Sequence, residues 1–138
     1  MKITGFRLGL LSAPLRVPFR TALREVGHVE DMVVELYTSD GAVGRGEAPP
    51  TAAVTGETLG SIQAALAGHI CPALVGREVS DLEELCSVIS RSIVGNTSAK
   101  AAAEIAVWDL YGQACGLPLY KLLGGGRTAL ETDLTISV

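Results

Sequence analysis

Residues 97–126 read TSAKAAAEIAVWDLYGQACGLPLYKLLGGG, and they carry the clearest secondary-structure signal in the chain. Asn96, Thr97 and Ser98 are small residues of the kind that begin helices, and strong helix formers follow them. Gly116, with Pro118 just beyond it, is typical of a helix end. We therefore expect one helix of about five turns that stops at Gly116.

This helix has two apolar faces. At about 100° per residue, Lys100 and Glu104 fall on one polar edge, and Asp109 and Gln113 fall on the opposite edge. The first apolar face carries Ala99, Ala103, Ala106, Val107, Leu110 and Ala114, and the second carries Ala101, Ile105, Trp108, Gly112 and Cys115. A surface helix needs only one apolar stripe, so we expect protein outside this small domain to cover the second face. The central helix of a stand-alone helical domain would show the same pattern.

Three segments before residue 49 alternate apolar and polar side chains, as strands with one buried face do. The segments are 2–13, 29–38 and 42–48, and Asp40-Gly41 predicts a hairpin turn between the last two. Pro14 and Pro18 interrupt the pattern, so we expect residues 15–28 to form a loop. A second loop begins at Pro49-Pro50 and ends at Gly56.

Two more helices are expected between this second loop and residue 96. Apolar residues keep helical spacing from Leu59 to Ile70, and Pro72 should end that helix. Ser80 followed by Glu83 predicts a capping box at the start of the next helix. Its buried stripe would be Leu82, Leu85, Cys86, Ile89 and Ile93. Three antiparallel strands followed by three helices make an α+β fold.

The last residues of the chain alternate again. Residues 132–138 have the pattern of a strand, yet no later segment of the sequence can pair with it. We expect this strand to be the first of a β/α barrel that is otherwise missing, because such barrels need about 250 residues. The chain would thus divide into a capping domain, 1–126, and a connector with the first barrel strand, 127–138.

Composition excludes several classes of protein. The 138 residues carry a formal net charge of −4, and no basic patch is available for a nucleic acid. The uncharged run 58–75 contains polar residues and Pro72, so we do not expect it to cross a membrane. Cys71, Cys86 and Cys115 lack the spacing of metal ligands and predict reduced thiols in a cytoplasmic protein.

A self-contained active site is not expected. His28 and His69 have no neighbouring residues that would complete a metal site or a catalytic triad, and the glycine-rich segments 44–47 and 124–126 lack the spacing of phosphate loops. We therefore assign no catalytic residue and no metal ligand to this stretch.

The two loops are nevertheless unusual. The first places Phe19 near Arg24 within neutral residues, and the second is stiffened by prolines and carries Val54 near its middle. Apolar loops with one cation suit a lid over a ligand that bears a carboxylate. On composition alone, a solvated surface arginine and a packing valine explain the same residues.

The long helix carries a motif that resembles a known family. Glu104, Ala106, Asp109 and Gly112, followed by segments 117–120 and 122–125, resemble the mandelate racemase/muconate lactonizing branch of the enolase superfamily. Within that branch, the loop segments resemble dipeptide epimerases of the L-Ala-D/L-Glu type. The matching segments are 18–24, 46–51, 55–57, 98–102 and 130–133 before Thr135.

The resemblance implies an enolase-type capping domain and a 1,1-proton transfer at the α-carbon of the second residue of a dipeptide. Two lysines of the barrel would move the proton, and Mg²⁺ held by three barrel carboxylates would stabilise the enediolate. None of those groups is in this sequence, and Lys100 and Lys121 belong to the cap. The expected partners are the dipeptide, the protein's own C-terminal barrel and further copies of the chain in a homo-oligomer.

Four residues are expected to bind the substrate, and two of them, Arg24 and Thr135, carry over from the family. The resemblance implies that Arg24 pairs with the acidic side chain of the substrate and that Thr135, on the first barrel strand, contacts the substrate. Phe19 and Val54 would wall the pocket from above, and the loops would exclude water when closed.

Two alternatives share part of this pattern. N-acylamino acid racemases, o-succinylbenzoate synthases and muconate cycloisomerases share the helix motif, and the two loops favour a dipeptide epimerase over them. A non-catalytic α+β interaction module, which would bind a partner through the second helix face, is the alternative from another class.

Overall fold

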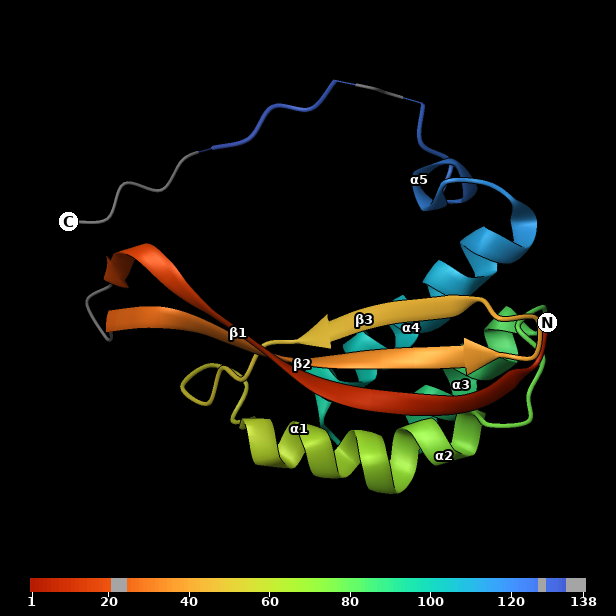
Figure 1. Ribbon diagram of the computed structural model, residues 1–138, viewed down its shortest axis with the longest axis horizontal. Helices are drawn as coiled ribbons and strands as arrows, with labels where there is room; N and C mark the ends of the chain where they lie inside the picture. Colours follow the sequence, from red (N-terminus) through yellow and green to blue (C-terminus); the bar gives the residue numbers. More distant parts are fainter. Residues whose placement is uncertain (21–24, 127–128, 134–138) are drawn as a thin grey trace.

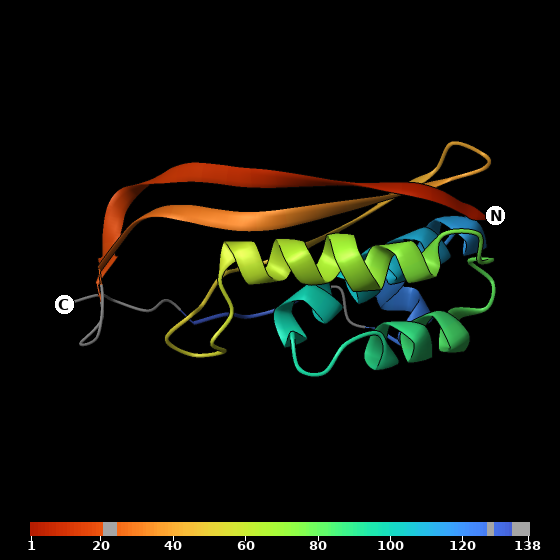
Figure 2. The same cartoon turned by 90° about the horizontal axis from the view of Figure 1, so that it is seen from below.

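The computed structural model describes residues 1–20, 25–126 and 129–133. A three-stranded antiparallel sheet in the order β1-β2-β3 consists of β1 (Ile3–Arg20), β2 (Glu25–Thr38) and β3 (Val43–Ala48). The helical segments that follow are α1 (Leu59–Ala65), the π-helical η1 (Leu66–Ile70), α2 (Cys71–Leu74), α3 (Leu82–Arg91), α4 (Thr97–Cys115) and α5 (Leu119–Leu122). The sheet forms one layer and the helices lie on one side of it (Figures 1 and 2). The predicted α+β fold is confirmed, with the short α5 as an addition.

The core lies between the sheet and the helices. Met32, Val34 and Leu36 alternate along β2 and are buried, as the period of a half-buried strand requires. On α4 the buried residues of the first apolar face are Ala99, Ala103, Ala106, Val107 and Leu110. Ala114 is exposed, contrary to the prediction, because its neighbour Gln113 already bonds to Val43, the first residue of β3, where the strand begins.

The second apolar face of α4 is uncovered in the part of the chain that the structure describes. Ala101, Ile105 and Cys115 are exposed, and Trp108 is half-buried. Gly112 is the exception, since the chain turns back after α4 and a Cβ on Gly112 would lie 3.3 Å from the carbonyl oxygen of Leu117. The expectation of two apolar faces therefore holds for most of the helix.

β3 and α4 approach each other very closely. Gly44 and Gly46 occupy alternate positions of β3, and both are buried against α4. A Cβ on Gly44 would collide with the carbonyl oxygen of Ala106, and a Cβ on Gly46 with that of Ala102. The segment 44–47, which the sequence shows not to be a phosphate loop, thus serves to bring the helix backbone against the strand.

The prediction of a loop at residues 15–28 is wrong, because the described residues of this segment lie in β1 and β2. β1 continues through Pro14 and Pro18 to Arg20, and it pairs again with β2 at Phe19–Val26 and Arg20–Glu25 after a register shift. β1 is an edge strand, where a missing backbone N–H is tolerated, so the prolines bend the strand without ending it. The result is a long two-stranded arm, β1–β2, that projects from one end of the sheet (Figures 1 and 2).

The first helical run also differs from the prediction. It continues past Pro72 to Leu74, because the π-helical turn η1 lies directly before the proline. There the N–H of Cys71 donates to the carbonyl of Leu66, five residues back, and the wider turn leaves room for the ring of Pro72.

The predicted capping box at Ser80 and Glu83 is wrong. α3 begins after Asp81 without a side-chain cap, and the hydroxyl of Ser80 lies against Asp81 instead. A capping box is present at Thr58 and Ser61, at the start of α1. Ser61, at the third helical position, accepts the backbone N–H of Thr58, which is the bond that a glutamate makes in the predicted form of the box.

The predicted barrel strand, 132–138, lies mostly outside the described residues. Residues 129–133 have no regular secondary structure, and residues 134–138 lie outside the described part. Among the described residues, no helix has both the length and the apolar character that a membrane span requires.

Candidate functional site

The structure describes two of the four predicted substrate-binding residues. Phe19 lies in the arm on β1, opposite Val26, and its exposed fraction is 40%. Val54 lies in the loop between β3 and α1, and its exposed fraction is 80%. Arg24 and Thr135 lie outside the described residues. The role of Phe19 and Val54 at a substrate stays a prediction.

The loop that carries Val54 is a compact turn. The backbone N–H groups of Val54 and Thr55 both donate to the carbonyl of Thr51 at 2.8 Å, and that of Gly56 donates to Ala52 at 3.1 Å. The hydroxyl of Thr55 lies 3.3 Å from that of Thr51. The turn therefore holds its own shape and presents Val54 to solvent.

A pocket of about 270 Å³ joins the arm to this loop. Its walls come from β2 within the arm and from the residues that follow β3, and they combine apolar, acidic and imidazole side chains. The lining residues are Val26, His28, Val29, Glu30, Asp31, Pro49, Pro50 and Thr51. The arm and the start of the loop after β3 thus line one pocket, and both lie at the same end of the sheet (Figure 1).

Glu57 ties the loop to α4. Its carboxylate accepts hydrogen bonds from the hydroxyl of Thr97 at 3.1 Å and from the backbone N–H of Ser98 at 3.0 and 3.1 Å. The N–H of Ala99 donates to it at 3.4 Å. Glu57 therefore caps the long helix from a segment forty residues earlier in the chain.

Burial and hydrogen bonding act on Glu57 in opposite directions. Burial by itself would raise the pKa of this carboxyl, but the hydrogen bonds from Ser98, Ala99 and Thr97 favour the ionised form and outweigh it. The pKa of Glu57 is therefore lowered. Glu57 is not among the predicted site residues, although the sequence carries a signal: it is the sole Asp, Glu, Lys or Arg between Glu47 and Arg77.

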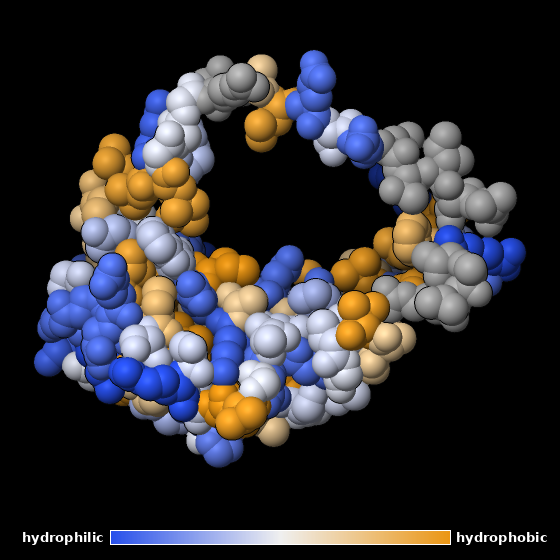
Figure 3. All heavy atoms as spheres, turned by 180° about the vertical axis from the view of Figure 1, so that it is seen from behind, coloured by the Kyte–Doolittle hydropathy of each residue, from blue (hydrophilic) through white to orange (hydrophobic). Residues whose placement is uncertain are grey.

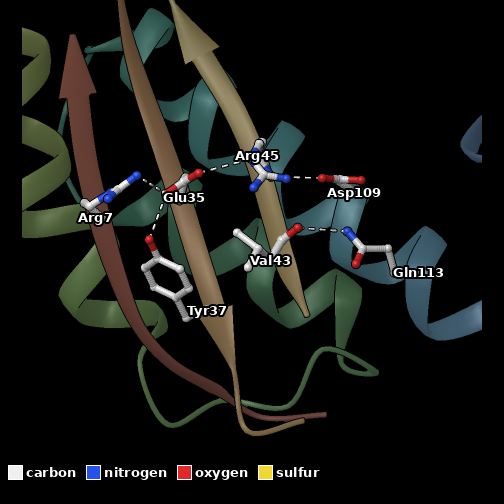
Figure 4. Close-up of polar contacts among 7 residues, drawn as sticks. All are labelled: Arg7, Glu35, Tyr37, Val43, Arg45, Asp109 and Gln113. Carbon is white, nitrogen blue, oxygen red and sulfur yellow. Dashed lines mark hydrogen bonds and ion pairs between the residues drawn. The ribbon is translucent and has the colours of Figure 1, made fainter. Parts of the chain in front are cut away.

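A second charged cluster lies on the face of the sheet that points away from the helices (Figure 4). Glu35 accepts a hydrogen bond from the hydroxyl of Tyr37 at 2.7 Å and pairs with Arg7 at 3.0 Å and Arg45 at 3.1 Å. The bond from Tyr37 and the two guanidinium groups lower the pKa of Glu35. Because Arg7, Glu35 and Arg45 come from three neighbouring strands and pair across them, the cluster is best explained as a cross-strand network.

The polar edge of α4 has a structural role beside this cluster. The carboxylate of Asp109 accepts the backbone N–H of Arg45 at 2.9 Å, and the amide of Gln113 donates to the carbonyl of Val43 at 3.0 Å (Figure 4). Both backbone groups belong to β3, which is an edge strand. The helix side chains thus satisfy groups that would otherwise be open to pairing with another strand.

Two of the described thiols are less acidic than an ordinary cysteine thiol. Burial raises the pKa of the Cys71 thiol to about 12, and it also raises that of Cys86. Within the described part, no three His, Cys, Asp or Glu side chains are grouped as a metal site would require.

Comparison with known proteins identifies the family of this domain. Residues 8–124 match the model of the mandelate racemase/muconate lactonizing enzyme N-terminal domain. An L-Ala-D/L-Glu epimerase of Clostridium acetobutylicum is 51% identical over 138 residues, which is 100% of this chain and 38% of that protein. The chain therefore spans little more than a third of the length of this relative.

Solved structures match over the whole chain as well. The substrate-liganded L-Ala-D/L-Glu epimerase of Bacillus subtilis is 46% identical with a TM-score of 0.96, covering 100% of this chain and 38% of that one. A dipeptide epimerase of Methylococcus capsulatus, solved with Mg and the dipeptide L-Arg-D-Lys, is 36% identical with a TM-score of 0.91 over 100% and 39% of the two chains. The chain belongs to the mandelate racemase/muconate lactonizing enzyme family and comprises its N-terminal domain.

Proposed function

We propose that this chain is the capping and substrate-specificity part of a magnesium-dependent dipeptide epimerase that acts on L-Ala-L/D-Glu-like dipeptides. The observation that carries the proposal is the identity of 51% to an L-Ala-D/L-Glu epimerase along the whole chain, both loops included. The pocket at which the arm and the loop meet supports it, because a lid needs the two segments on the same side of the fold.

The chain's own residues would bind and shelter the substrate. We propose that Arg24 pairs with the side-chain carboxylate of the second residue and that Thr135 contacts the substrate from the first barrel strand. Phe19 and Val54 would narrow the space above it and keep water away from the reacting carbon. The half-exposed state of Phe19 and the high exposure of Val54 leave both side chains free to contact a ligand.

The chemistry itself would take place on the barrel. Mg²⁺, bound to carboxylates outside this sequence, would supply positive charge that stabilises the negative charge developing on the substrate. The M. capsulatus relative was solved with Mg and a dipeptide, which supports the same cofactor here.

A barrel fits the uncovered surface of the domain. Apolar side chains gather over the end of α4 and over α5 (Figure 3). Ile105, Leu117, Tyr120 and Leu123 are each about half exposed or more. We propose that the barrel covers this surface, that the domain ends near residue 126, and that the full-length protein is a cytoplasmic homo-oligomer with a role in cell-wall peptide metabolism.

The alternatives have weaker support. A racemase, synthase or cycloisomerase of the same branch would also contain this domain, but the identity to L-Ala-D/L-Glu epimerases reaches 51% and 46% over the whole chain. A non-catalytic module has no such relatives among these comparisons.

Deuterium exchange at the α-carbon tests the proposal. Full-length protein is incubated in D₂O with L-Ala-L-Glu and Mg²⁺, and the product is followed by proton NMR. We expect loss of the glutamate α-proton signal, formation of the D-Glu epimer, and no reaction after chelation of the metal. Absence of exchange with every dipeptide in a panel would overturn the proposal.

A further inference from the structure

Glu57 is a buried charge at the end of an exposed loop. Its exposed fraction is 6%, whereas the residues of the turn before it, 52–56, are all exposed. A buried carboxylate needs partners, and those of Glu57 come from α4. A surface loop thus places one charged side chain into the interior, where it contacts the longest helix.

The start of α4 depends on this carboxylate. Asn96, which precedes the helix, has a positive φ of 53°, and its side-chain amide donates to the carbonyl of Val94 instead of accepting from the helix. The first N–H groups of a helix have no partner within the helix, and the helix dipole favours an anion at that end. Glu57 satisfies two of these N–H groups, those of Ser98 and Ala99.

The same contact fixes the loop. Between described residues, the hydrogen bonds that join segment 49–57 to α4 all end on the Glu57 carboxylate. The turn at 51–56 is internally bonded, so it moves as a unit. Gly56 links the turn to Glu57 with a positive φ of 78°, a conformation in which glycine is unrestrained. Without the carboxylate contact, the turn would lose its anchor on this side.

We propose that Glu57 is the positioning residue of the 49–58 loop. Its hydrogen bonds to the start of α4 anchor the loop. The anchored loop holds Val54 and the pocket wall Pro49–Thr51 in the place that dipeptide binding requires. The effect on substrate rests on the proposed epimerase function. The anchoring of the loop does not, because it follows from the contacts of Glu57 alone.

The test uses the full-length enzyme with a graded pair of variants. Glu57→Gln keeps one acceptor oxygen but turns an NH₂ group toward N–H donors, and Thr97→Ala removes one of the donors to Glu57. Glu83→Gln, at an exposed position of α3, is the control for charge. Leu85 lies on the buried face of α3, so Leu85→Ala is the control for a variant that loses stability while the contacts of the loop stay unchanged.

Two measurements separate anchoring from general stability. We expect Glu57→Gln to raise KM for L-Ala-L-Glu about tenfold with little change in kcat, the effect of weakening roughly one charge-assisted hydrogen bond. Thr97→Ala should act in the same direction and less strongly. Hydrogen–deuterium exchange should become faster in segments 51–58 and 97–99 of both variants. Leu85→Ala should lower Tm without raising KM and without faster exchange in these segments.

Each result decides one of the two claims. Unchanged exchange in the loop of Glu57→Gln would overturn the anchoring, and faster exchange with an unchanged KM would overturn the positioning role. If the wild-type enzyme epimerises no dipeptide, the proposed function fails, and loop exchange alone then decides whether Glu57 anchors the segment.

Discussion

Single small residues set the distance between the sheet and its main helix. Gly44 and Gly46 face Ala106 and Ala102 so closely that neither glycine has room for a Cβ. The sequence shows two glycines at alternate positions of a strand and alanines four apart on a helix. Which glycine faces which alanine depends on the tertiary structure and cannot be predicted from these patterns. Backbone contact of this kind cannot relax by rotating a side chain, so these positions should be among the least tolerant in the domain.

Gly46→Ala should destabilise the domain. The new methyl group would meet the carbonyl of Ala102, and over-packing against backbone costs about 1–3 kcal/mol or more of unfolding free energy. Gly9→Ala is the matched control, because nothing lies within 4 Å of a Cβ at that position of β1. Urea unfolding measures both, and equal stability of the two variants would contradict the close approach of β3 and α4.

Arg24→Met in the full-length enzyme should impair binding of acidic dipeptides specifically. A charge-assisted hydrogen bond contributes about 1.5–3 kcal/mol, which corresponds to a rise in KM of roughly 10- to 150-fold for L-Ala-L-Glu. A dipeptide with a neutral second residue serves as the control and should be affected little. Equal losses on the two substrates would remove Arg24 as the residue that selects the side chain.

At the scale of elements, the bounds of a helix or strand can be predicted where residues at its ends give a clear local signal. The helix from Thr97 to Cys115 is observed at its predicted bounds, because Gly116 and Pro118 leave no alternative end. The arm formed by β1 and β2 was missed, since Pro14 and Pro18 are read as breakers unless the strand is known to be an edge. The extension past Pro72 was missed for a similar reason, because the π-helical turn that accommodates it has no sequence signal of its own.

The junction between the loop and α4 should respond to pH. Because the pKa of Glu57 is lowered in the folded protein, its ionised form stabilises the fold above the ordinary glutamate pKa of about 4.3. That contribution is lost as the pH falls through the folded pKa. Glu57→Gln should therefore be less stable than the wild type at pH 7, by about 1.5–3 kcal/mol, and the difference should shrink below pH 4.

Urea unfolding of the wild type and the variant over this pH range measures the difference. Glu35 and Asp40 also have lowered pKa values, but they are present in both proteins and cancel in the comparison. A difference in stability that stays constant down to pH 2 would show that the charge of Glu57 is not what caps α4.

At the scale of the whole molecule, the two apolar faces of α4 have different surroundings. One face packs on the sheet, while Ile105 and Trp108 on the other face are uncovered in the described part of the chain. The sequence predicts this from two apolar stripes on one helix. What it does not reveal is the site, because Glu57 meets α4 across forty residues of chain, and the pocket near Pro49 forms where β2 extends past the end of β3.

Trp108→Ala should loosen the domain from the rest of the full-length protein. Its ring packs edge-on against Tyr111, with centroids 6.0 Å apart, and is half-buried in this chain. If the barrel covers the remainder, removal of the ring should cost about 3–5 kcal/mol in the full-length protein and clearly less in the 138-residue chain. Calorimetric melting of both lengths tests this, and an unchanged Tm of the full-length variant would show that the face is exposed.

Substrate preference tests the central claim most directly. We would measure kcat/KM of the full-length protein with Mg²⁺ for L-Ala-L-Glu and for its neutral isostere L-Ala-L-Gln. The account predicts epimerisation of L-Ala-L-Glu with a preference of at least about tenfold, because one charge-assisted hydrogen bond is lost with the isostere. Equal efficiency on both dipeptides, or turnover of neither, would contradict the assignment of this domain as the cap that selects an acidic dipeptide.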